Sequence, residues 1–105
     1  MTTTYILGPG GIAVPEPDPI AWARWLSTAQ RHLAITEIGD CRISTVFLGL
    51  DHGLGGAPLL WETMVFGGEM DGEMERYSTK EEAERGHNEL VGRLTRKALP
   101  RKKYT

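Results

Sequence analysis

The chain of 105 residues is predicted to fold as one α+β domain, an antiparallel β-sheet with three central strands and an N-terminal hairpin, accompanied by two helices. Residues 31–66 alternate between short apolar runs and glycine-containing turns, which is typical of strands joined by hairpins. Two stretches, near residues 19–30 and 79–98, carry apolar residues at helical spacing behind a capping residue. We assign residues 1–99 to this domain and residues 100–105 to a basic tail.

The N-terminal part is predicted to form the hairpin and then the first helix. The apolar pieces Tyr5–Leu7 and Ile12–Val14 flank the turn sequence GPGG. Asp18 is suited to cap the helix of residues 19–30, with Pro19 at the first position, where a missing N–H has no cost. A stripe of large residues such as the one in this helix is more often a core face than a binding platform, so we expect it to be buried. The stripe consists of Trp22, Trp25, Leu26 and Ala29.

The register of the central strands follows from two turns. Gly39-Asp40 suits a two-residue type II′ turn, and an acid then faces a base across the first hairpin. The resulting pairs are Ile38–Cys41, Glu37–Arg42, Ile35–Ser44 and Leu33–Val46. The second hairpin is closed by residues 51–58, which places Phe47 opposite Glu62.

With this register, both faces of the sheet are rich in apolar side chains. One face carries Leu33, Ile35, Val46, Leu48, Leu59, Trp61 and Val65. The other carries Ala34, Ile38, Ile43, Phe47, Leu60, Glu62, Met64 and Phe66. Both faces therefore require cover from helices or from a second subunit. Because two helices can hardly cover both, we expect a homo-oligomer, most simply a dimer.

The C-terminal part is predicted to be a polar connection, residues 67–77, followed by the second helix. Ser78 and Glu81 have the spacing of a capping box at the start of that helix. Pro100 ends it. The apolar stripe of the helix consists of Ala83, His87, Leu90, Val91, Leu94 and Ala98.

Composition excludes several classes of protein. With 40% apolar and 25% charged residues, the chain is typical of a globular domain. A net charge of −2 argues against nucleic acid as a partner, although the basic tail offers some phosphate-binding charge. The single cysteine, Cys41, excludes an internal disulfide and fits a reducing compartment. Neither a secretion signal nor a membrane span is recognisable, so we expect a cytoplasmic protein with no membrane partner.

Metal and catalytic sites are also disfavoured. Asp51, His52, Glu62 and His87 could converge on a metal, but no H-x-x-x-H or C-x-x-C spacing supports this. For Asp51 we favour hydrogen bonding to its own loop backbone, with His52 solvated. The glycine-rich GLGGAP segment is followed by a strand rather than a helix, unlike a phosphate-binding loop. We expect no catalytic residue, metal or cofactor.

Glu62 and His87 are the two polar residues in otherwise apolar surroundings. Glu62 interrupts an apolar strand face, and His87 interrupts the stripe of the last helix. A buried ion pair between them is slightly favoured over a shared binding site.

The segments STVFLGLDH and ETMVFGG, followed by ERYST and GH, resemble small uncharacterised proteins encoded by bacteriophages and prophages. The similarity runs from about residue 14 to residue 87 and implies an accessory protein acting in the bacterial host cell. It transfers no catalytic residue. Small phage accessory proteins commonly act by binding, here a host protein or a small signalling ligand, in some cases to counter a host defence.

The candidate binding residues are therefore Asp51, His52, Glu62, Arg76, Tyr77 and His87. Two alternatives stay open. One is a nucleic-acid-binding regulator that uses the basic tail, and the other is a small hydrolase that uses Asp51, His52 and Glu62.

Overall fold

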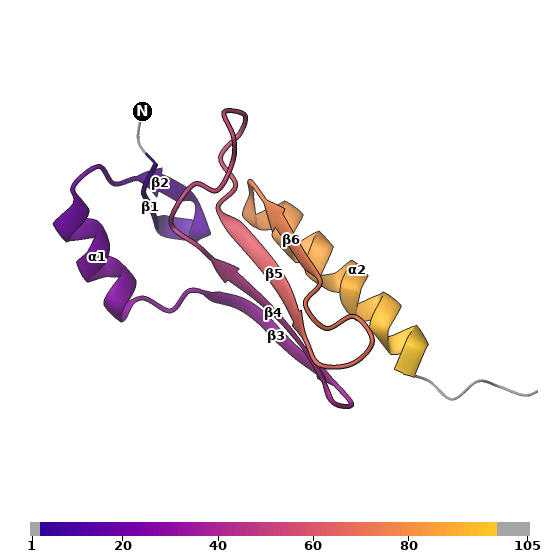
Figure 1. The fold of residues 1–105 in the computed structure, drawn as a ribbon. Helices are drawn as coiled ribbons and strands as arrows, with labels where there is room; N and C mark the ends of the chain where they lie inside the picture. Colours follow the sequence, from indigo (N-terminus) through magenta and orange to yellow (C-terminus); the bar gives the residue numbers. More distant parts are fainter. Residues whose placement is uncertain (1–2, 99–105) are drawn as a thin grey trace, which may run out of the picture.

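A computed structural model describes residues 3–98 and has an α+β fold built on a four-stranded antiparallel sheet (Figure 1). Each strand pairs with the next one along the chain. The strands are β3 (His32–Ile38), β4 (Cys41–Phe47), β5 (Trp61–Phe66) and β6 (Met74–Tyr77). The long helix α2 (Lys80–Ala98) then runs back along one face of this sheet. Among residues 3–98 no helix combines the length and the apolar character needed to cross a membrane.

The N-terminal hairpin and first helix are confirmed. β1 (Tyr5–Leu7) and β2 (Ala13–Pro15) form a separate two-stranded sheet around a short 3-10 turn, η1 (Pro9–Gly11). α1 (Pro19–Thr28) follows, and the Asp18 carboxylate accepts a hydrogen bond from the Ile20 N–H at 3.0 Å, as its cap. In Figure 1 the hairpin and α1 lie at one end of the large sheet.

The two tryptophans of α1 attach this helix to the rest of the protein. The Trp22 indole N–H donates to the Gly49 carbonyl at 3.0 Å. The Trp25 ring meets the buried Phe47 ring edge-on, with ring centroids 5.8 Å apart. The stripe therefore faces the protein and does not form a solvent-facing platform, although its four residues are half-buried and not fully buried as expected.

The predicted register is correct for most of the first hairpin and wrong for the second. Glu37 pairs with Arg42, but an irregularity near the start of β3 places His32, not Leu33, opposite Val46. In the second hairpin Phe47 faces Trp61, one residue away from the predicted Glu62. Since alternate strand residues point to opposite faces, a slip of one residue interchanges the two faces.

The slip has a physical cause in the connection between β4 and β5. Its backbone pairs with the N-terminal segment as well as with the start of β5. The Tyr5 N–H donates to the Gly49 carbonyl, and the Asp51 N–H donates to the Thr3 carbonyl, each at 2.8 Å. A simple hairpin closed by residues 51–58 does not form, because part of its backbone is engaged elsewhere.

The face of the sheet under α2 holds the core. Seven residues of β4 and β5 on this face are buried: Cys41, Ile43, Thr45, Phe47, Trp61, Thr63 and Val65. From α2 they meet Ala83, His87, Leu90 and Leu94, which are the buried members of the predicted stripe. The opposite face, with Ile35, Val46 and Met64, has no such cover among the described elements.

The sheet contains one strand more than predicted. Residues 67–77 are not merely a polar connection, because a turn at Asp71-Gly72 returns the chain into β6. Gly72 has φ +86°, and its N–H donates to the Val65 carbonyl at 2.8 Å. A strand this short and polar gives a weak sequence signal, although the Asp-Gly pair does indicate the turn.

The capping box of α2 forms one residue later than predicted. The Thr79 hydroxyl accepts from the Glu82 N–H, and the Glu82 carboxylate accepts from the Thr79 N–H, both at 3.1 Å. Ser78–Glu81 and Thr79–Glu82 have the same spacing, so the sequence alone does not distinguish them. The basic tail, residues 100–105, lies outside the described residues.

Gly86 and Gly92 of α2 lead to opposite predictions for substitution by alanine. A Cβ on Gly86 would overlap the Tyr77 ring, whereas on Gly92 it would meet only the flexible Arg96 side chain, at 3.5 Å. Gly86→Ala is expected to lower the free energy of unfolding by about 1–3 kcal/mol through overpacking. Gly92→Ala is expected to raise it by up to about 1 kcal/mol, since alanine favours the helix. Urea unfolding of both variants measures these changes, and equal effects would contradict the close packing of Tyr77 on α2.

Candidate functional site

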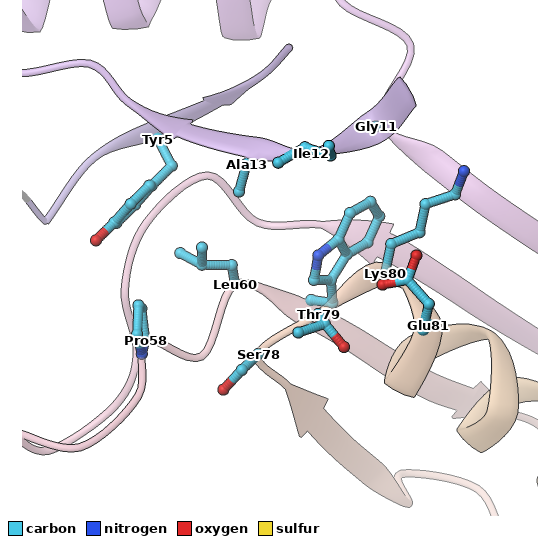
Figure 2. A pocket seen from close by; sticks show the side chains of 11 residues that line it. Tyr5, Gly11, Ile12, Ala13, Pro58, Leu60, Ser78, Thr79, Lys80 and Glu81 are labelled. Atoms are coloured by element: carbon cyan, nitrogen blue, oxygen red, sulfur yellow. The ribbon is translucent and has the colours of Figure 1, made fainter. Parts of the chain in front are cut away.

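A cavity of about 260 Å³ lies between the β1–β2 hairpin and the start of α2 (Figure 2). Three segments distant in sequence form its walls. Tyr5, Ile12 and Ala13 come from the hairpin, and Leu60 and Trp61 come from the start of β5. Ser78, Thr79, Lys80 and Glu81 contribute the polar side, where α2 begins. The cavity thus depends on how the hairpin is placed against the large sheet.

Trp61 provides the most informative polar group of this cavity. Its side chain is only 2% exposed, yet its indole N–H has no hydrogen-bond partner among the described residues. The N–H is not sealed in the core either, because no fully enclosed side-chain nitrogen or oxygen in the described part of the chain lacks a partner. Trp61 is also one of the residues that line the cavity, so the cavity is the place where we expect this N–H to be reached. A donor in this position favours a ligand with an acceptor oxygen.

Lys80 brings a positive charge to the same cavity. Its side chain reaches from α2 towards the hairpin (Figure 2) and passes over Gly11, where a Cβ would lie 3.1 Å from the lysine Cδ and 3.3 Å from Nζ. The ammonium makes no ion pair within residues 3–98. The Ser78 and Tyr5 hydroxyls also have no protein partner in that range. Four donors and one acid, Glu81, therefore belong to residues that line the cavity, and in Figure 2 the Tyr5 hydroxyl and the Lys80 ammonium lie towards opposite ends of it.

This combination suits the binding of a small molecule. The apolar side chains would cover a hydrophobic or aromatic body, and the free donors would bind an anionic or oxygen-rich group. A volume near 260 Å³ lies at the small end of ligand sites, which favours a compact ligand.

Sequence reasoning missed this site. The apolar pattern places Trp61 only on a sheet face, and Lys80 lies inside the predicted capping box, two residues after Ser78. The hairpin and the start of α2 are more than sixty positions apart, and no local pattern indicates that they meet.

Asp51 has the structural role that the sequence suggests. One carboxylate oxygen accepts from the Gly53 N–H at 2.7 Å and from the Leu59 N–H at 2.9 Å, which closes the loop between β4 and β5. The His52 side chain is exposed. The Asp51 carboxylate thus binds its own loop, while the His52 side chain faces solvent.

Glu62 does not pair with His87, so this prediction is wrong. The Glu62 carboxylate accepts a hydrogen bond from the Arg76 guanidinium at 3.0 Å, on the sheet face opposite α2. His87 is a buried residue of α2, and its ring contacts Thr45 on the other face of the sheet. The error has two causes: the one-residue slip of the second hairpin, and the strand β6, which places Arg76 directly opposite Glu62.

His87 belongs instead to a buried row of hydroxyls. Its Nε2 lies 2.9 Å from the Thr36 hydroxyl and its Nδ1 lies 2.7 Å from the Thr45 hydroxyl. The Thr45 hydroxyl also forms a hydrogen bond of 2.6 Å with the Thr63 hydroxyl, which is the last member of the row. A neutral imidazole, with one donor and one acceptor nitrogen, fits between two hydroxyls. Burial lowers the pKa of His87, so the neutral form is favoured.

Tyr77 lies next to this row and is also a structural group. Burial is the main cause that raises its pKa to about 12, and the neighbouring Thr63 hydroxyl acts in the opposite direction. The phenol donates to the Glu75 carboxylate at 3.0 Å, which favours the neutral phenol further. Neither Tyr77 nor His87 presents a free group to a ligand.

The predicted site residues therefore fall into three separate places. Asp51 and His52 lie in the β4–β5 loop, and Glu62 and Arg76 lie on the uncovered sheet face. Tyr77 of β6 and His87 of α2 lie between the sheet and this helix. In residues 3–98 no three His, Cys, Asp or Glu side chains gather in a way that could hold a metal ion. Comparison of the chain with family models, with curated proteins and with solved structures gives no match.

His87 makes stability depend on pH in a defined direction. Because its pKa is lowered in the folded protein, the unfolded chain takes up the proton first as the pH falls. The His87 contribution is fully present above the unfolded pKa of about 6.5 and is lost as the pH falls through the lower folded pKa. Denaturant unfolding between about pH 7.5 and pH 5 should show a steeper loss for the wild type than for His87→Gln, which does not titrate there. Parallel curves for the two proteins would contradict a buried neutral histidine.

Proposed function

We propose that this protein is a non-enzymatic binding protein that holds a compact ligand with an anionic group in the cavity between the hairpin and α2. The observation that carries the proposal is the indole N–H of Trp61, a nearly buried residue that lines this cavity: the N–H has no partner among residues 3–98 and is not fully enclosed. A polar group left in this condition costs free energy unless water or a ligand binds it. The unpaired Lys80 ammonium supports an anionic ligand.

The hydrogen bonds of the other polar groups favour a binding function over a hydrolase activity. The Asp51 carboxylate is bound to its own loop, and the Glu62 carboxylate is bound to Arg76. A general base needs a free position within hydrogen-bond reach of a substrate, and these two carboxylates have other partners in different places. The nucleic-acid alternative depends on the basic tail, which lies outside the described residues.

The biological setting of the proposal comes from the resemblance to phage-encoded proteins. In that setting the protein would act in the cytoplasm of the bacterial host cell as an accessory protein that sequesters a small signalling ligand or blocks a host protein. The cavity favours the first of these roles. We also propose that it acts as a homodimer, because one face of the sheet has no helix over it among the described elements.

The ligand proposal is tested by the indole N–H signals of ¹⁵N-labelled protein, titrated with phenyl phosphate and, as a neutral analogue, with benzyl alcohol. The chain has three tryptophans, and the Trp61 signal is the one that Trp61→Phe removes. We expect phenyl phosphate to shift the Trp61 signal, with little effect of benzyl alcohol. The Trp22 signal serves as an internal control, since that N–H is already bound to the Gly49 carbonyl.

Lys80→Met should weaken phenyl phosphate binding at least about tenfold, because a charge-assisted contact is lost. Arg85→Met, on an exposed position of the same helix, is the matched control and should leave the affinity unchanged. A Trp61 signal that moves with neither compound, or equal affinities of the two variants, would count against the proposal.

A further inference from the structure

The face of the large sheet opposite α2 carries a group of exposed apolar side chains. We call it the open face. Ile35, Phe66 and Met74 are 49%, 47% and 41% exposed, and Val46 and Met64 lie half-buried beside them. The strand pairing places Ile35, Ser44, Met64 and Met74 in one row across all four strands. No described helix packs on this row, since α2 lies on the other side of the sheet. Contiguous exposed apolar surface of this kind marks an interaction site.

The charges of the open face occupy two of its corners. Glu37 and Arg42 form an ion pair of 3.4 Å at the β3–β4 turn, and both side chains are more than half exposed. The second pair, Glu62 and Arg76, lies at 3.0 Å on β5 and β6, towards the opposite end of the strands. The two pairs therefore lie at diagonally opposite corners, on either side of the apolar row. Two acids and two bases leave the face without net charge.

A surface of this composition is complementary to a second copy of itself. In a symmetric dimer the same patch occupies both sides of the interface, so charged regions must meet charged regions. For two sheets that face each other, a two-fold axis parallel or perpendicular to the strands would place each ion pair over a corner of the partner that has no ion pair. That arrangement removes water from the ion pairs and gives them no polar partner on the other copy. An axis along a diagonal of the face places ion pairs on ion pairs. It also brings together the two corners without ion pairs, one with His32 and Val46 and the other with Phe66.

We infer that two copies of this chain pack through their open faces with their strands crossing at nearly right angles. A diagonal two-fold axis produces this crossing, and orthogonal sheet packing is one of the two common arrangements of stacked sheets. The inference rests on the homodimer in the proposed function and adds its surface and its geometry. The ligand cavity lies on the α2 side of the sheet, so it stays accessible in this dimer.

Analytical ultracentrifugation of the wild type and two variants tests the surface. Ile35→Glu should raise the dimer dissociation constant at least about tenfold, because it buries a charge without a partner. Leu54→Glu is the matched control, since Leu54 is fully exposed at the tip of the β4–β5 loop and should leave the dimer unchanged. Circular dichroism should give both variants the wild-type fold. A wild-type monomer would overturn both the homodimer and this inference, whereas a dimer unaffected by Ile35→Glu would overturn the inference alone.

A photo-cross-linking residue at Ile35 tests the geometry. With a diagonal axis, Ile35 lies over the ends of β4 or β5 of the other copy, so cross-linked peptides should contain Arg42 and Phe66, or Val46 and Glu62. With strands aligned, Ile35 would lie over Ile35 or Met74 of the other copy. Mass spectrometry of the digested dimer distinguishes the two results, and cross-links to Ile35 or Met74 would refute the orthogonal arrangement.

Discussion

The Gly49 carbonyl oxygen holds the two parts of this protein together. It accepts the Tyr5 N–H at 2.8 Å and the Trp22 indole N–H at 3.0 Å, so both the hairpin and α1 are bound to one atom. Gly49 is buried with φ +76°, and a Cβ there would lie 3.2 Å from Leu26 Cδ2 and 3.2 Å from the Tyr5 carbonyl oxygen. Only glycine tolerates this conformation and this crowding without strain. The rest of the architecture follows from this attachment, which sets the end of β4 and places the hairpin beside the start of α2.

The sequence predicted the parts of the fold that depend on local chemistry. Asp18 and Pro19 indicated the start of α1, and Gly39-Asp40 indicated the first hairpin, because caps and tight turns are formed by neighbouring residues. The register of the second hairpin was wrong because pairing with Thr3 and Tyr5 competes for the same backbone. β6 was missed because its four residues, MERY, lack the apolar alternation of a half-buried strand.

The candidate site could not be predicted either, because it also depends on contacts between distant segments. Every residue proposed from the sequence was chosen for its chemistry in one segment, and the structure uses most of those groups to stabilise the fold. His87 joins β3 and β4 through Thr36 and Thr45, and Glu62 joins β5 to β6 through Arg76. The groups left free, on Tyr5, Trp61 and Lys80, belong to three segments that meet only in the folded chain. In this protein, a polar residue within an apolar stretch of sequence therefore does not indicate a binding site, because its polar group is already hydrogen-bonded to a partner in the fold.

Because of the attachment at Gly49, we expect the N-terminal part to open separately from the large sheet. The large sheet and α2 share an extensive buried core, whereas the hairpin and α1 are joined to it through Gly49, through the Asp51–Thr3 bond and through packing at residues such as Trp25. A unit held in this way opens at a lower free energy than global unfolding. Amide hydrogens of β1 and β2 would then exchange with solvent while those of β4 and β5 stay protected. Because the hairpin forms one wall of the cavity, its opening also exposes Trp61, and the rate of that opening would limit how fast a ligand enters and leaves.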